Sequence, residues 1–135
     1  DQVMHQQIDP HTRLGRPLKR RQHLADVYFD AFSSNPSIRC LSVEPDRESA
    51  WHLFPIMVDA DREEVFRYLR SVGIGVNVHY QPVYLHSYYQ ELGYSAGLCP
   101  VAEEAYAGLL SLPMWHGLTD EDQERVIQEV LRAVS

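Results

Sequence analysis

Cysteine and lysine are scarce in this chain of 135 residues, and their scarcity excludes several kinds of site. The two cysteines, Cys40 and Cys99, lie far apart and outside any CxxC spacing, so we expect reduced thiols in a cytoplasmic protein. The seven histidines show no HxxxH or HExxH spacing, which argues against a metal site. Lys19 is the only lysine, and it stands among arginines in a segment with no obvious pocket.

Long apolar runs and concentrated positive charge are also missing. The mainly apolar stretches are far too short to cross a bilayer and no signal peptide opens the chain, so we expect no membrane segment. A net charge of −7 argues against nucleic acid as a partner, because phosphate binding needs a dense basic surface. The one dense basic run comprises Arg13, Arg16, Lys19, Arg20 and Arg21. We interpret it as the solvated face of a first helix, in preference to an anion contact or a surface for a neighbouring segment.

Familiar catalytic motifs are absent as well, so the residues alone assign no catalytic group. The chain contains no GxSxG, no P-loop and no paired-carboxylate motif. Residues 1–16 have neither strand nor helix periodicity and begin at Asp1, which we interpret as the irregular start of a fragment or a processed product. Residues 17–135 are long enough to form one domain with its own hydrophobic core.

Hydrophobic periodicity in residues 17–135 predicts short strands alternating with helices. Pro55 removes a ladder donor from one strand, which we therefore expect at a sheet edge or at a bulge. Asp61 and Thr119 each open a capping box, and Gly73 supplies a left-handed helix stop. The expected helices span 17–33, 61–72, 84–94, 99–110 and 119–134, and the expected strands span 38–43, 51–59, 74–80 and 109–114.

This succession predicts an α/β protein of the α+β type, in which helices cover a small sheet of three or four strands. The strand, helix and strand between residues 51 and 80 predict a crossover unit. The last helix carries five apolar residues, and burial at about 1.5–3 kcal/mol for each is enough to hold it on the sheet. These residues are Val126, Ile127, Val130, Leu131 and Val134.

The stretch GIGVNVHYQPVYLHSYY combines an expected strand with an unusual polar face. Asn77, His79 and Gln81 occupy alternate strand positions, and the ring donors Tyr84 and His86 follow. A buried polar group without a partner costs about 1–3 kcal/mol, so such a face requires water, a protein partner or a ligand. One interpretation is a pocket for the hydroxyl and phosphate groups of a polar ligand. The other is that His79 binds a backbone carbonyl while the tyrosines only pack.

Three segments resemble the carboxyl-terminal part of the DegT/DnrJ/StrS family of sugar aminotransferases: WHLF, VGIGVNVHYQPVYLHSYY and PVAEEAYAGLLSLPMWHGLTDEDQERVIQEVL. The resemblance covers residues 51–131 and, more loosely, 18–34, whereas 1–16 depart from the family pattern. Within the family, the chain resembles the transaminases of the pseudaminic-acid pathway. Those enzymes aminate C4 of a UDP-linked 4-keto-6-deoxy-N-acetyl-hexosamine.

The resemblance implies that residues 17–135 are the small domain of a longer enzyme that uses pyridoxal phosphate (PLP). A large domain of the same polypeptide, absent from this chain, would supply the lysine that forms the Schiff base with the cofactor. Lys19 lies outside the family's lysine motif, so we expect the isolated chain to be inactive and to bind no PLP alone. Glutamate as amino donor, a UDP-sugar substrate and a homodimeric parent are further expectations.

The resemblance also implies a substrate-binding role for the segment Val78, His79 and Tyr80, which in the family reaches the mouth of the active site. The full expected substrate-binding set is Asn77, Val78, His79, Tyr80, Gln81, Tyr84 and His86, with no catalytic, cofactor or metal residue. Two alternatives remain open at this point. One is a non-catalytic α/β ligand-binding or regulatory module, and the other is a purely structural interaction domain.

Overall fold

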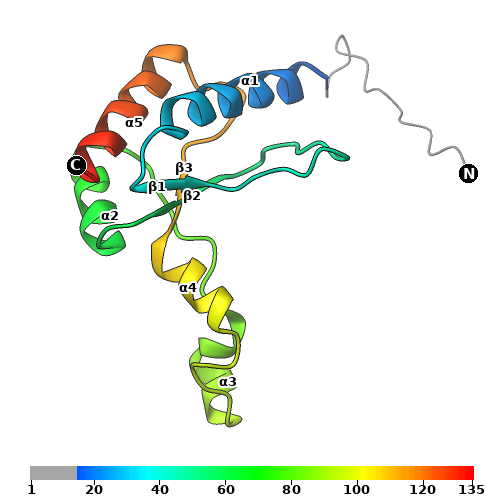
Figure 1. The fold of residues 1–135 in the computed structure, drawn as a ribbon, viewed down its shortest axis with the longest axis vertical. Helices are drawn as coiled ribbons and strands as arrows, with labels where there is room; N and C mark the ends of the chain where they lie inside the picture. Colours follow the sequence, from blue (N-terminus) through cyan, green and yellow to red (C-terminus); the bar gives the residue numbers. More distant parts are fainter. Residues whose placement is uncertain (1–14) are drawn as a thin grey trace, which may run out of the picture.

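Three short strands form an antiparallel sheet at the centre of residues 15–135, the part of the chain that the computed structural model describes (Figure 1). The strand order is β1-β2-β3, with Ile38 opposite Val58 and Ile56 opposite Leu110. The prediction of a small sheet covered by helices is therefore confirmed. In chain order the elements are α1 (Gly15–Phe32), β1 (Ile38–Cys40), β2 (Phe54–Val58), α2 (Arg62–Ser71), η1 (Val83–Leu85), α3 (Ser87–Glu91), α4 (Pro100–Gly108), β3 (Leu109–Leu112) and α5 (Asp120–Ala133).

The core lies between the sheet and the helices α1, α2 and α5, which pack on one another and on the sheet. Aromatic rings join α1 to the start of β2, with the ring centroids of Tyr28 and Phe54 4.9 Å apart. The predicted stripe on α5 is confirmed for Val126, Ile127 and Val130, which are buried, whereas Leu131 and Val134 are half-buried at its margin. In Figure 1 α1 lies along one side of the sheet, and α5 lies beside α1.

β2 is the central strand and its register with β3 is unbroken through Pro55, so the prediction that Pro55 marks a sheet edge or a bulge is wrong. Pro55 is tolerated there because β1 is short. The last β1–β2 pair joins Cys40 and Ile56. Pro55, the next residue toward the start of β2, has no partner on β1 and therefore needs no backbone hydrogen bond on the β1 side. On its other side Pro55 lies opposite Ser111 of β3.

The predicted strand at 74–80 is also wrong: the segment after α2 is extended but makes only one isolated bridge, between Asn77 and Ser111. The two residues exchange both backbone hydrogen bonds, at 3.2 and 2.7 Å. In this register Gly75 would pair with Pro113, which has no N–H to offer, so the ladder cannot extend in that direction. The predicted crossover is nevertheless present, because β2 and this segment are both antiparallel to β3 and hence parallel to each other.

The helix ends follow the predicted caps. The carboxylate of Asp61 accepts hydrogen bonds from the backbone N–H groups of Glu63 and Glu64, and the hydroxyl of Thr119 accepts one from Asp122. Gly73 has a φ of 83°, as the left-handed stop requires. The expected helix at 84–94 is divided into η1 and α3, with the extended residue His86 between them.

The basic run belongs to α1 and is only partly a solvated face. Arg20 donates to the carbonyl of Leu118 and to Asp120, both at 2.6 Å, and so joins α1 to the start of α5. Arg13 lies outside the described residues, as does most of the predicted irregular segment 1–16, although α1 already begins at Gly15. Over the described range, no helix combines the length and the apolar character that a membrane span needs.

Residues 82–108, here called the arm, comprise η1, α3 and α4 with their connecting turns. Figure 1 shows α4 and α3 extending away from the sheet on the side opposite α1. The base of the arm contacts α2, where the guanidinium of Arg62 lies 5.3 Å from the ring centroid of Tyr106. The helix α4 begins with Pro100 in its first turn, as predicted.

Candidate functional site

A cavity of about 420 Å³ opens beside the extended segment, within the size range of small-molecule sites. Most of its walls come from three parts of the chain: the turn and segment from Gly73 to His79, the end of β3 with the following turn to Leu118, and the first turns of α5. Leu53, just before β2, also lines it. The bridge between Asn77 and Ser111 joins the first two walls. Residues far apart in the sequence thus meet at one concave surface.

Two residues that line the cavity have buried polar atoms without hydrogen-bond partners. Ser111 is 3% exposed, and its hydroxyl finds no partner among the described residues. The Nδ1 atom of His79 is likewise buried and unpartnered. Each unsatisfied buried group costs about 1–3 kcal/mol, so a side-chain rotation that turns either atom toward the cavity and gives it a ligand or water as partner is favoured. With the amide of Asn77 at the rim, the cavity suits a ligand rich in hydroxyl or carbonyl groups.

Other residues that line the cavity carry charge and an aromatic ring. Arg125 of α5 donates to the backbone carbonyl of Val72, which orients its guanidinium beside the cavity. Asp122, in the first turn of the same helix, also lines the cavity. The indole of Trp115 lies close to Gly117, where an added Cβ would stand 3.0 Å from its Nε1 atom, so a larger residue would press on the indole.

The structure divides the predicted substrate-binding residues into two groups. Asn77 and His79 line the cavity. Val78 packs half-buried against the hydrophobic core. Tyr80 is 74% exposed and does not line the cavity, and Gln81 donates to the carbonyl of Leu85 instead of continuing the polar face.

Tyr84 and His86 lie on the arm and not at the cavity. Tyr84 donates to Glu103 at 2.7 Å, and the same Glu103 oxygen accepts from the backbone N–H of Gly97 at 2.8 Å. The hydrogen bonds from Tyr84 and Gly97 hold the pKa of Glu103 below its usual value. Partial burial and, to a smaller extent, the hydrogen bond to Glu103 raise the pKa of Tyr84 to about 12. His86 is exposed at the start of α3.

Ser111, Trp115 and Arg125 are among the lining residues that sequence reasoning missed. Ser111 could have been noticed as the polar residue inside the apolar run LLSLP. Trp115 and Arg125 gave no signal of their own, because their place at the cavity depends on how the turn after β3 and the helix α5 pack against the segment after α2.

The comparisons with known proteins agree with this architecture. The model of the DegT/DnrJ/EryC1/StrS aminotransferase family matches residues 11–131. This match covers most of the chain, and the chain belongs to that family.

Two relatives have names from sugar chemistry, and both are longer than this chain. The chain is 36% identical over 125 residues to the spore coat polysaccharide biosynthesis protein SpsC of Bacillus subtilis. It is 31% identical over 123 residues to a UDP-4-amino-4,6-dideoxy-N-acetyl-beta-L-altrosamine transaminase of Campylobacter jejuni. These matches cover 87% and 88% of this chain but only 32% of each relative, so the chain spans about a third of their length.

A solved structure shares the fold. The aminotransferase TlmJ from Streptoalloteichus hindustanus superposes with a TM-score of 0.80 at 30% identity. The superposition covers 90% of this chain and 32% of that one. The relatives thus support an aminotransferase as the class of protein.

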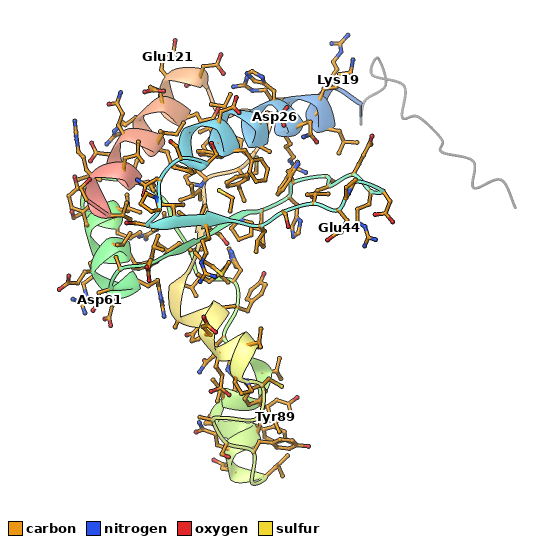
Figure 2. All side chains as sticks on the ribbon, viewed as in Figure 1. Lys19, Asp26, Glu44, Asp61, Tyr89 and Glu121 are labelled. Carbon is orange, nitrogen blue, oxygen red and sulfur yellow. The ribbon has the colours of Figure 1, made fainter. Side chains whose placement is uncertain are left out.

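The residues of this chain do not fit PLP. The cofactor is held as a Schiff base by a lysine, and the only lysine here is Lys19 on α1. Lys19 is exposed and does not line the cavity, and Figure 2 shows it near the amino-terminal end of α1. No step of the cofactor's chemistry is therefore assigned to these residues. Over residues 15–135 no cluster of three or more potential metal-binding side chains is found.

Proposed function

We propose that residues 17–135 are the small domain of a longer PLP-dependent nucleotide-sugar aminotransferase, and that the cavity receives part of the keto-sugar nucleotide. The observation that carries the proposal is the pair of unpartnered buried atoms, His79 Nδ1 and Ser111 Oγ, beside a cavity in a chain of this family. Once the two side chains rotate toward the cavity, a sugar hydroxyl or carbonyl provides the partners that these atoms lack.

Each cavity residue has a role in this proposal that its chemistry supports. His79 and Ser111 hydrogen-bond the sugar, and the amide of Asn77 binds at the rim. Arg125, oriented by its bond to Val72, supplies positive charge toward the phosphates of the nucleotide. Tyr80, outside the cavity and highly exposed, contacts the ligand from the side of the large domain.

The finer assignments rest on the family resemblance. The substrate is a UDP-linked 4-keto-6-deoxy-N-acetyl-hexosamine, as in the pseudaminic-acid pathway, and the amino donor is glutamate. The parent enzyme is a cytoplasmic homodimer. A relative at 31% identity that is a UDP-sugar transaminase supports the substrate, although the relative at 36% identity is named only for spore coat polysaccharide biosynthesis.

The first test is to express the parent enzyme with PLP and record its absorption spectrum. We expect a Schiff-base chromophore that borohydride reduction traps on a lysine of the parent, and no such band from the 135-residue chain. A parent without the chromophore that still binds a UDP-sugar would instead identify a non-catalytic binding module.

The second test addresses the cavity in the parent enzyme. His79→Ala removes the group beside the cavity, so we expect KM for the UDP-sugar to rise about tenfold or more, as expected for the loss of a buried hydrogen bond. His79→Asn restores a polar atom near the Nδ1 position and should recover part of that loss. His52→Ala is the control, since His52 is exposed and does not line the cavity. Unchanged kinetics in His79→Ala would refute the assignment of the cavity.

A further inference from the structure

The arm differs from the rest of the molecule because none of its residues is buried. It nevertheless carries six of the eleven large hydrophobic side chains that are exposed within residues 15–135, and Val101 is 81% exposed. Exposed apolar side chains gathered on one element mark an interaction surface. The six are Val83, Tyr88, Leu92, Tyr94, Leu98 and Val101.

The internal contacts of the arm set its shape but provide little stability. Glu103 joins η1 to the turn at Gly97, and the ring of Tyr89 stands edge-on to Tyr88 and Tyr94. The helices α3 and α4 have 5 and 9 residues, and isolated helices below about 12–15 residues are marginal in water. With no side chain fully buried, helices this short gain little from packing within the chain and would be stabilised by a surface that covers them.

The composition of the arm indicates the chemistry of that surface. Between Ser71 and Glu124 there is no lysine or arginine, and the exposed charges on the arm are the carboxylates of Glu91 and Glu104. Tyrosine enrichment without lysine is typical of the core of a protein–protein interface. The complementary surface is therefore apolar at its centre and neutral to basic at its rim.

We propose that the arm is the docking element of the small domain, and that its occupant is the large part of the parent aminotransferase. This inference rests on the proposed function, because the occupant exists only if the chain is part of a longer enzyme. The length of the relatives supports it: about two thirds of each lies outside the matched region, which is ample chain to form such a surface. Figure 2 shows Tyr89 near the far end of the arm, well away from α1 and α5.

Hydrogen exchange of the unmodified proteins tests the docking directly. We expect the backbone amides of α3 and α4 to exchange at least about tenfold more slowly in the parent enzyme than in the 135-residue chain, while those of α1 change little. Equal exchange of the arm in both proteins would overturn the proposal, as would a gene that encodes no further domain. A parent that protects the arm but forms no Schiff base would leave the docking intact and refute the proposed function.

A pair of variants supplies the second measurement. Val101→Asp places a charge on the docking surface in the first turn of α4, where an acidic residue favours the helix, so the arm itself should not unfold. We expect Val101→Asp to lower Tm of the parent by several degrees and to leave Tm of the 135-residue chain unchanged. The matched control Val43→Asp, at an exposed valine outside the arm, should alter neither. Self-association of the 135-residue chain that Val101→Asp abolishes would identify a second copy as the occupant and overturn the proposal.

Discussion

Gln123 is buried on the helix α5, and its amide Nε2 donates to the backbone carbonyl of Leu24 on α1 at 2.7 Å. This bond joins two helices through residues that lie 99 positions apart in the sequence. A buried amide with a partner specifies how two helices pack, because any other arrangement leaves the amide unsatisfied.

Gln123→Ala should therefore lower the free energy of unfolding by about 2 kcal/mol, through the lost hydrogen bond and the space left behind. Denaturant unfolding of the chain measures the change. Gln128→Ala on the same helix is the control: Gln128 is exposed and bonds only to Glu124, so its loss should cost less than about 0.5 kcal/mol. Equal effects of the two substitutions would contradict the role assigned to Gln123.

Predictions made from single residues are confirmed where the structure at that residue depends on contacts within a few positions. The caps at Asp61 and Thr119 and the left-handed Gly73 depend on contacts within a few residues, and all three are confirmed. Gln123 gave no such signal, because a polar residue on a helix is ordinarily solvated and its burial depends on a distant partner.

At the scale of an element, the arm is held in shape by Glu103, whose carboxylate accepts bonds from Tyr84 and Gly97. The lowered pKa of Glu103 means that these bonds stabilise the arm above the usual carboxyl pKa and are lost as the pH falls through the folded value. The pKa of Tyr84 is raised from 10.0 to about 12, so its contribution is complete below pH 10 and is lost as the pH rises through about 12. The arrangement is therefore intact across the neutral range.

The titration of Glu103 is visible at the Gly97 amide. Between neutral and acid pH, we expect its NMR chemical shift to move with a midpoint below the ordinary glutamate value of 4.5. The movement should vanish in Glu103→Gln and persist in Glu104→Gln, because Glu104 is exposed and is not part of this network. A midpoint at or above the ordinary value would exclude the hydrogen-bonded carboxylate.

At the scale of the whole molecule, Gly108 sits where the arm joins the sheet. A Cβ added there would stand 2.8 Å from the carbonyl oxygen of Val58, a contact that the backbone cannot relieve without moving α4 from β2. Gly75, in the extended segment, offers a matched comparison, because a Cβ added to it would meet no atom within 4 Å.

Gly108→Ala should lower the free energy of unfolding by about 1–3 kcal/mol, the usual cost of overpacking, and shift the NMR signals of β2 and α4 together. Gly75→Ala should change stability by less than about 0.5 kcal/mol. Thermal unfolding with paired spectra compares the two variants. A Gly108→Ala protein as stable as the wild type would show that the arm can be displaced freely.

By itself, the amino-acid sequence determined the helices, their caps, the α+β class and the aminotransferase family, because periodicity, capping and family motifs are read over short distances along the chain. It also identified Asn77 and His79, which line the cavity. Tertiary structure alone decided that β2 is central, that Tyr80 lies outside the cavity, and that Ser111, Trp115 and Arg125 complete its walls. The position of each of these residues depends on which distant segments pack together. The energy of such packing comes from both segments, so neither segment alone predicts it.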